Sequence, residues 1–335
     1  MVRDSPAPAV RFGTLGCADI ALRRTLPAMR AEESVELVAV ASRAPERATK
    51  CAAAFGADAE KSYDDLLRRP DVEAVYLPLP TGLHHEWASR ALAAGKHVLA
   101  EKPLATSHSE AADLAGLARA GGLVLMENLT FHRHPVHRLS RELVESGRIG
   151  ELRSLHAEFA FPPLPDRDIR YRPDLGGGAL LDAGVYPAKA ARMFLGEDLT
   201  VVGAVARREP RYGVDIAGSA LLARPDGVTA HLTFGFEHFY RCAYTLWGST
   251  GRLEVGRAFT PPPQLAPPVR LVTGDGVEEF TGPPVDQFQL TLAAFARAVR
   301  GPRADAGPVD DALRQAQLID LIAKSSARAL EDSHA

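Results

Sequence analysis

The first 130 residues alternate between short apolar runs and segments with helical periodicity. The apolar runs have the length and composition of buried strands, at residues 10–15, 35–41, 72–77, 97–99 and 123–126. One helical segment follows the first run up to residue 29, and others occupy residues 45–55, 63–68, 86–94 and 107–120. Strands that alternate with helices predict an α/β Rossmann domain with a doubly wound parallel sheet, whose ligands lie at the carboxyl ends of the strands.

Beyond residue 150 the pattern changes to consecutive strands. Residues 152–161 alternate as a strand, a proline-rich and charged loop follows, and a helix runs from the glycines at 176–178 to residue 195. Strand-like runs come next, at residues 201–208, 216–223, 228–238 and 242–247, and helices at 287–299 and 309–329 close the chain. This predicts an α+β domain with a large, mostly antiparallel open sheet. We therefore expect one domain at residues 1–130 and a second at 131–335.

Composition restricts the classes of partner. The chain has 335 residues, 46% of them hydrophobic, and a formal charge of −3, so neither nucleic acid nor an anionic membrane is expected as a partner. No apolar run reaches the roughly 18 residues of a membrane span, and residues 1–9 lack the apolar run of a signal peptide. The cysteines at 17, 51 and 242 fit neither a disulfide framework nor a zinc site. We expect a soluble, cytoplasmic protein.

A small-residue turn follows the first strand. Its residues have the spacing G-x-A-x-x-A and run Gly16, Cys17, Ala18, Asp19, Ile20 and Ala21. Strand, glycine turn and helix form the context of a dinucleotide site, because the free N–H groups of the helix N-terminus attract a pyrophosphate. An ordinary tight turn between strand and helix remains the alternative.

The end of the second strand indicates which dinucleotide binds. Many such folds carry an acid there that bonds the adenosine ribose, whereas this strand ends in Ser42 and Arg43. No carboxylate repels a 2′-phosphate at this point, and the Arg43 guanidinium offers a fork to bind it. We therefore expect NADP(H), although Arg43 is also compatible with a solvated loop.

The carboxyl edge of the predicted sheet gathers further polar residues. Candidate cofactor or substrate contacts that follow strand ends are Leu79, Thr81, His84, Glu101, Lys102 and Asn128. Glu101 and Lys102 end a short apolar run, and Pro103 prevents further strand pairing. Lys102 is thus placed either to act on a substrate or to be a charged loop residue.

The first half resembles the glucose–fructose oxidoreductase and inositol dehydrogenase (Gfo/Idh/MocA) family. The resemblance is carried by P-T-G-L-H at residues 80–84, A-G-K-H-V-L-A-E-K-P-L-A at 94–105, and Glu127 followed by His134-Pro135. Ala18, in a position where a glycine is usual, is the departure from the family pattern.

A second resemblance lies at residues 170–186, which read R-x-R-x-x-L-G-G-G-A-L-L-D-x-G-x-Y. It implies that Asp182 and Tyr186 face the nicotinamide and that Arg170 contacts the cofactor. The spacing alone places Asp182 and Tyr186 on one helix face, and it also allows Tyr186 to be a core aromatic residue.

Residues 240–263 look most like those of the nucleotide-sugar 3-ketoreductases of deoxysugar biosynthesis. The resemblance implies NADPH-dependent reduction of the C-3 ketone of a dTDP-linked 4-keto-2,6-dideoxyhexose, with Tyr240 and Thr260 as substrate contacts. One alternative is oxidation of a free sugar or diol, as in the xylose and dihydrodiol dehydrogenases. The other is a non-catalytic NADP-binding regulator.

The expected chemistry is hydride transfer to a carbonyl carbon with a proton for its oxygen. Lys102 can supply that proton, or it can assist Tyr186 in doing so. Glu101 and Asp182 would hold the lysine and the cofactor in place. No metal is expected, because Pro135 interrupts the group His132, His134 and His137. The broad sheet predicts a homo-oligomer, a dimer or a tetramer, formed through its outer face.

Overall fold

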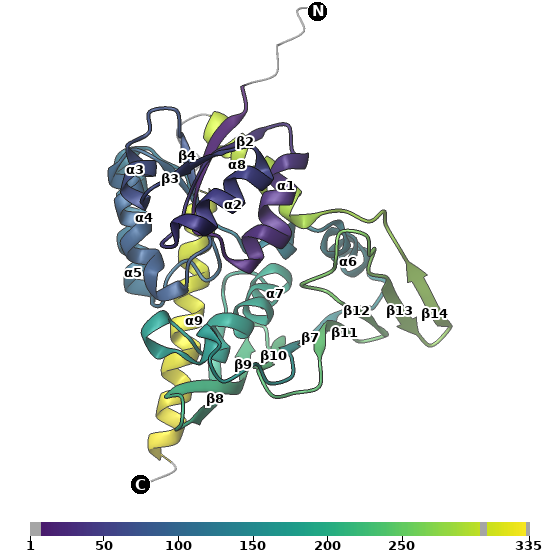
Figure 1. Ribbon diagram of the computed structural model, residues 1–335. Coiled ribbons are helices and arrows are strands. Elements are labelled where there is room, and N and C mark those ends of the chain that lie inside the picture. The colour runs from purple at the N-terminus through teal and green to yellow at the C-terminus, as the bar shows by residue number, and fades with distance from the viewer. Residues whose placement is uncertain (1–7, 302–306, 333–335) are drawn as a thin grey trace, which may run out of the picture. The chain divides into compact units, whose positions relative to one another are not determined.

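The computed structural model describes residues 8–301 and 307–332 (Figure 1). Residues 1–9, whose lack of an apolar run is noted above, lie largely outside these residues. The chain divides into two compact units, one of Met1–Asn128 with Phe288–Leu313, the other of Leu129–Gln287 with Arg314–Ala335. These units resemble the proposed domains 1–130 and 131–335, except that residues 288–313 group with the N-terminal unit.

Unit 1 is built on a parallel six-stranded sheet with the strand order β3-β2-β1-β4-β5-β6. The strands are Val10–Leu15 (β1), Val35–Ala41 (β2), Asp58–Glu60 (β3), Ala74–Leu77 (β4), His97–Ala100 (β5) and Leu125–Glu127 (β6). All four residues of β4 are buried, as expected for a central parallel strand covered on both faces. The expected Rossmann domain is confirmed; β3, a short strand at the edge, was not predicted.

The helices of unit 1 include two that begin at a serine cap. They are Leu26–Ala31 (α1), Pro45–Phe55 (α2), Tyr63–Arg68 (α3), His84–Ala93 (α4), His108–Gly121 (α5) and Gln287–Arg300 (α8), with a 3₁₀ turn at Thr81–Leu83. The Ser62 and Ser107 side chains cap α3 and α5, each accepting a bond from a backbone N–H three residues on. A five-residue π-helical stretch, Ala21–Thr25, precedes α1.

Unit 2 contains the expected large open sheet. Its order is β14-β13-β12-β11-β7-β10-β9-β8, and every neighbouring pair is antiparallel except β7 with β10. The strands are Leu152–Ala160 (β7), Thr200–Glu209 (β8), Val214–Ala223 (β9), Thr229–Gly235 (β10), Arg241–Gly248 (β11), Gly251–Gly256 (β12), Val269–Thr273 (β13) and Gly276–Phe280 (β14). The last three strands were not predicted.

The helices of unit 2 include one that sequence reasoning missed. They are Pro135–Glu145 (α6), Val185–Leu195 (α7) and Gly307–Asp332 (α9), with short turns at Thr130–Arg133, Ile169–Tyr171 and Pro173–Leu175 and a π-helical stretch at Leu180–Gly184. Pro135, which interrupts the group of three histidines in the sequence, stands at the start of α6. At that position its missing N–H costs no hydrogen bond. The boundary between the two units falls within α9.

One face of the large sheet carries the core of unit 2. Along β11, Cys242, Tyr244 and Leu246 are buried, and along β7 Leu155 and Ala157 are buried, while the residues between them are more exposed. Apolar side chains from α7 complete this core. The alternation shows that the sheet buries one face and leaves the other open.

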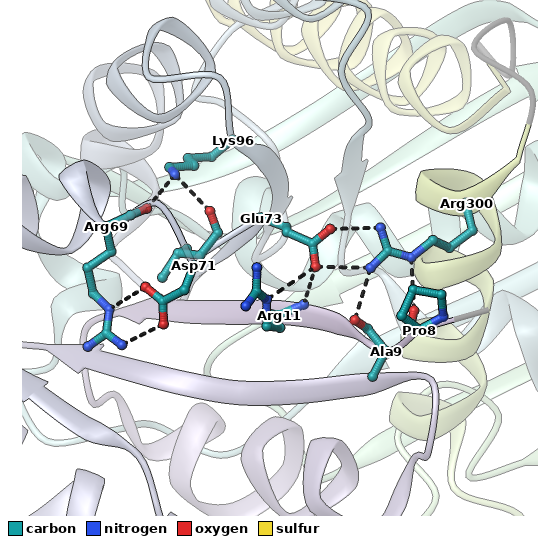
Figure 2. Close-up of polar contacts among 9 residues, drawn as sticks. Pro8, Ala9, Arg11, Arg69, Asp71, Glu73, Lys96 and Arg300 are labelled. Carbon is teal, nitrogen blue, oxygen red and sulfur yellow. Dashed lines mark hydrogen bonds and ion pairs between the residues drawn. The ribbon is translucent and has the colours of Figure 1, made fainter. Parts of the chain in front are cut away.

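Arg300 at the end of α8 attaches this helix to unit 1 (Figure 2). Its guanidinium donates to both carboxylate oxygens of Glu73, at 2.7 and 2.9 Å, and to the carbonyl oxygens of Pro8 and Ala9. The Phe295 ring of α8 also packs against the Phe12 ring of β1, with 5.2 Å between the two ring centroids. These contacts explain why residues 288–313 belong with unit 1 although they follow unit 2 in the chain.

A buried lysine orders the loop before β4. The Lys96 ammonium is 8% exposed and donates to the carbonyl oxygens of Arg69 and Val72, both at 2.7 Å (Figure 2). Burial lowers the pKa of Lys96. Lys96 belongs to the A-G-K-H motif, and its position gives that residue a structural role.

No helix within residues 8–301 and 307–332 has both the length and the apolarity to span a bilayer.

We expect Arg300→Met to lower the free energy of unfolding by about 2 kcal/mol at neutral pH, because it leaves the partly buried Glu73 carboxylate without its bidentate partner. Arg300 also holds the pKa of Glu73 below its usual range. That stabilisation is present at neutral pH and is lost as the pH falls through the folded-state pKa of Glu73. Urea unfolding from pH 7 to pH 3 measures both effects. Arg297→Met, an exposed position on the same helix, is the control; an equal effect of both substitutions would contradict the assignment.

Candidate active site

The strand order of unit 1 reverses between β1 and β4, and the turn after β1 lies at this switch point. Gly16 has φ +121°, a conformation that L side chains rarely adopt. A Cβ on Gly16 would lie 3.2 Å from Leu79 Cδ2 and 3.5 Å from the Pro78 carbonyl oxygen. The loops after β1 and β4 therefore pass close to each other at Gly16, where a side chain would be crowded. The turn after the first strand is where a dinucleotide pyrophosphate binds in this fold.

Arg47 of α2 stabilises the same turn. Its guanidinium donates to the Cys17 carbonyl oxygen at 2.8 Å, and the Cys17 thiol lies 3.7 Å from the Arg47 carbonyl oxygen. Cys17 itself is buried, whereas Ala18 and Ile20 are partly exposed and Asp19 is exposed. Sequence reasoning missed Arg47. The backbone of the turn and the partly exposed Ala18 thus fit a pyrophosphate, with Arg47 providing positive charge nearby.

The end of β2 has the geometry of an adenosine-end site. Ser42 is buried and its hydroxyl accepts a bond from Ala44 N at 3.3 Å, which turns the chain away from the strand. Arg43 is exposed. This arrangement has a serine and an arginine where many dinucleotide folds have a carboxylate, and it fits a 2′-phosphate.

Glu101 lies in a buried hydrogen-bond network. Its Oε1 accepts from Tyr76 Oη at 2.6 Å and from Asn128 Nδ2 at 2.7 Å. The Tyr76 proton goes to Glu101, so the Thr25 hydroxyl, 2.8 Å away, donates to the Tyr76 oxygen. Burial raises the pKa of Glu101, while the bonds from Tyr76 and Asn128 oppose that rise. Glu101 and Asn128 therefore serve to order the edge of the sheet.

His84 joins the loops after β4 and β5. The ring is fully buried, with Nδ1 2.8 Å from the Pro103 carbonyl oxygen and Nε2 2.8 Å from the Leu79 carbonyl oxygen. Burial lowers its pKa. Because both ring nitrogens face carbonyl groups of the protein, His84 positions these two loops, and its expected contact with the cofactor stays a prediction. Thr81 and Leu79, in the first of these loops, are partly exposed.

Lys102 stands between residues that are held on both sides. Glu101 precedes it, Pro103 O faces His84, and Leu104 N donates to Glu127 Oε1 at 2.9 Å. Lys102 itself is partly exposed. The backbone of the E-K-P-L element is thus fixed by buried polar side chains, while the lysine remains accessible at the cofactor edge of unit 1.

Gly177 and Gly178, before α7, allow close approach of other segments in unit 2. A Cβ on Gly177 would lie 2.5 Å from the Arg170 carbonyl oxygen, and one on Gly178 would lie 2.4 Å from Asp215 Oδ1. Asp215 Oδ2 accepts from Leu180 N at 2.7 Å and so caps the helix that carries Asp182 and Tyr186. Burial raises the pKa of Asp215. Sequence reasoning missed Asp215, which lies in a β-rich run and gave no local signal.

Arg170 and Asp182 are brought together within unit 2. Arg170 Nε donates to Asp182 Oδ2 at 2.8 Å, and Nη1 lies 3.2 Å from Asp168 Oδ1. The two carboxylates raise the pKa of Arg170, with Asp182 as the larger influence. This ion pair connects the loop after β7 to the helix of Tyr186. It fixes the orientation of the Arg170 guanidinium and of the Asp182 carboxylate.

Tyr186 is partly exposed and its ring packs among phenylalanines. The centroid distances are 4.7 Å to Phe159, 5.8 Å to Phe131 and 5.9 Å to Phe259. Rings of this kind hold the phenol in one orientation and reduce access of water to it. Tyr186 is therefore packed against the core of unit 2 and also partly exposed, and its place at the nicotinamide stays a prediction.

Tyr240 and Thr260, the expected substrate contacts, lie side by side. The Tyr240 hydroxyl is 3.4 Å from Thr260 Oγ1, and the Cys242 thiol is 3.6 Å from the same oxygen. The His132, His134 and His137 side chains do not form a ligand set. In the described part of the chain, no group of three or more His, Cys, Asp or Glu side chains is placed to hold a metal ion. Burial lowers the pKa of His137 to about 3, so this ring is a neutral core residue.

Comparison with known proteins follows the two units. Residues 10–129 match a family model described as an oxidoreductase family with an NAD-binding Rossmann fold, and residues 137–254 match the GFO/IDH/MocA C-terminal domain. A dTDP-3,4-didehydro-2,6-dideoxy-alpha-D-glucose 3-reductase of Streptomyces antibioticus is 51% identical over 318 residues, which cover 95% of this chain and 97% of that protein. Its counterpart from Actinomadura kijaniata is 50% identical over 321 residues, with the same coverage of both.

The structural comparison gives the same result. A crystal structure of a 3-ketoreductase from Actinomadura kijaniata, in complex with NADP and TDP-benzene, matches with a TM-score of 0.91 and 50% identity, covering 95% of this chain and 98% of that one. Sequence, fold and the placement of the motifs agree, and the chain belongs to the Gfo/Idh/MocA oxidoreductase family.

Proposed function

We propose that the protein is an NADPH-dependent sugar 3-ketoreductase. Its substrate is the C-3 ketone of a dTDP-linked 4-keto-2,6-dideoxyhexose, an intermediate of deoxysugar biosynthesis. The observation that carries this proposal is Lys102, a partly exposed lysine on a backbone fixed at Glu101, Pro103 and Leu104, at the edge of a dinucleotide-binding sheet. The identity to the 3-reductases named above, which extends over nearly the whole chain, specifies the sugar.

The cofactor is NADP(H). The turn at Gly16 and the helix after it bind the pyrophosphate, and Ser42 with Arg43 binds the 2′-phosphate. When bound, the reduced cofactor supplies the hydride. Leu79, Thr81, Asn128 and the Arg170–Asp182 pair are the remaining contacts that we propose for it.

The proton comes from the chain. A hydride that forms a C–H bond at C-3 leaves the electron pair of the C=O bond on oxygen, which then takes a proton; the ketone is reduced to an alcohol and NADPH is oxidised to NADP⁺. Lys102 stabilises the developing charge on that oxygen, and either Lys102 or Tyr186 gives up the proton. The fixed backbone around Lys102 orients that donor within unit 1, and the aromatic packing around Tyr186 orients the other donor within unit 2.

A dehydrogenase of free sugars or diols is the second candidate, because the E-K-P-L-A element would serve that reaction equally well. The two candidate functions can be distinguished by the substrate that the protein turns over. The dTDP-linked 3,4-diketo-2,6-dideoxyhexose, made in situ, is incubated with NADPH, and product identification by mass spectrometry and NMR should show a new C-3 alcohol. Oxidation of D-xylose or a trans-dihydrodiol with NADP⁺, together with no turnover of the dTDP-sugar, would favour the second candidate. Single-turnover oxidation of NADPH excludes a purely regulatory protein.

We expect Lys102→Ala to lower kcat by about 100-fold or more while the NADPH dissociation constant changes little, because the substitution removes a proton and charge source and leaves the pyrophosphate turn intact. Steady-state kinetics and fluorescence titration with NADPH measure the two quantities. A variant that keeps most of the wild-type kcat would refute the role of Lys102.

We expect the double variant Ser42→Asp with Arg43→Ala to lose affinity for NADPH by about 10-fold or more, with little change for NADH, because a carboxylate would face the 2′-phosphate and its guanidinium partner would be gone. Dissociation constants for the two cofactors give the ratio. Equal use of NADH and NADPH by the wild-type protein would show that this turn does not select the cofactor.

We also propose a cytoplasmic homo-oligomer, a dimer or tetramer, assembled through the outer face of the large sheet. The three cysteines are free and buried, in keeping with a reducing compartment. The outer face includes the exposed Trp247 and the stacked rings of His156 and His231, whose centroids are 4.6 Å apart. A second copy placing the same strands on this face would bury these rings. Sedimentation as a monomer at micromolar concentration would contradict the assembly.

A further inference from the structure

A continuous row of side chains leads away from Tyr186 within unit 2. The Tyr186 ring contacts Phe259, whose neighbour Thr260 lies 3.4 Å from the Tyr240 hydroxyl. The Tyr240 ring in turn lies 4.8 Å from Cζ of Arg257. A substrate whose ketone is at Tyr186 can therefore extend along Thr260 and Tyr240 as far as the Arg257 guanidinium.

Arg257 differs from three arginines at this end of the sheet that pair with carboxylates. Arg170 pairs with Asp182, Arg207 with Glu237 and Arg241 with Glu158. Arg257 has no carboxylate partner among the residues that the structure describes, and its guanidinium lies over the Tyr240 ring. A guanidinium that stacks through its face keeps the N–H donors at its edge available. This end of the sheet thus presents a cation whose charge is not compensated by the protein.

The backbone of Arg257 is held in a conformation that favours glycine. Its φ is +52°. In the described part of the chain, every other residue with a positive φ is a glycine. The neighbouring residues are fixed by Cys242, whose carbonyl oxygen accepts from Ala258 N at 3.0 Å and whose thiol accepts from Phe259 N at 3.3 Å. Strain retained next to a site is a mark of function, because glycine would fit this turn better than arginine unless the side chain is needed.

We propose that Arg257, Tyr240 and Thr260 form the subsite for the nucleoside diphosphate part of the substrate. The Arg257 guanidinium binds the diphosphate oxygens, and the Tyr240 and Thr260 hydroxyls lie along the path between the diphosphate and the sugar. A diphosphate carries the negative charge and the paired oxygens that a guanidinium fork recognises. The subsite rests on the proposed function, because it requires a nucleotide-linked sugar, and it adds the group that selects such substrates over free sugars.

The test is binding of dTDP and of thymidine to the full chain, by isothermal titration calorimetry. Arg257→Gly should raise the dTDP dissociation constant by about 10- to 100-fold and leave that of thymidine unchanged, because a charged hydrogen bond is lost while the nucleoside contacts remain. Arg257→Gly should also unfold at a temperature no lower than the wild type, because glycine relieves the backbone strain. The control is Arg224→Ala, which removes an arginine paired with Asp226 in the turn between β9 and β10, at the opposite end of the sheet.

The outcomes separate the subsite from the function. Equal dTDP affinity in Arg257→Gly and the wild type overturns the subsite, and the NADPH-dependent reduction assay with the dTDP-ketosugar then shows whether the proposed function stands. A wild-type protein that binds no dTDP overturns the subsite as well, and if the reduction assay also fails, the proposed function fails with it. A lower unfolding temperature together with weaker thymidine binding would assign Arg257 a structural role instead.

Discussion

Glu101 is a carboxylate with 9% exposure, and a buried carboxylate is stable only where hydrogen bonds replace its hydration. Tyr76 from β4 and Asn128 from the end of β6 supply those bonds, and Thr25 completes the network from the helix after β1. The residue before Lys102 is thus tied to three other segments of the sheet edge. Lys102 keeps its place only if the strand order β1-β4-β5-β6 is intact, so the chemistry of unit 1 depends on its topology.

In unit 2, other groups fix the backbone that carries the candidate site residues. The helix that carries Asp182 and Tyr186 is placed by close backbone approach at Gly177 and Gly178, and Asp215 caps its first turn. The buried Glu101 fixes the backbone in unit 1 and the partly buried Asp215 does so in unit 2, while Lys102 and Tyr186, the proposed catalytic residues, are partly exposed. This division of roles places the functional groups accurately because the residues that hold them do not need to move.

Much of the fold could be predicted from the sequence where local signals agree. The bounds of β1, β2, α2 and α3 match the predicted ranges, because each has a clear apolar pattern and a turn or cap at its ends. The strands β12 to β14 escaped prediction, because turn residues and a proline-rich loop dominate that region. Asp215 and Arg47 escaped for another reason: each acts on a segment distant in sequence, to which no local pattern points. Residues of the motifs, including Glu101, could be identified, whereas Asp215 and Arg47, which lie outside them, could not.

The return of α8 to unit 1 has a consequence for synthesis of the chain. Glu73 lies in the first quarter of the sequence, and its guanidinium partner, Arg300, follows the whole of the large sheet. On the ribosome, the dinucleotide-binding sheet therefore emerges long before the helix that completes its core through Phe288, Leu292 and Phe295. Residues 129–287 of unit 2 are in this sense inserted into unit 1, so unit 1, whose synthesis begins first, cannot reach its full stability until α8 has been made.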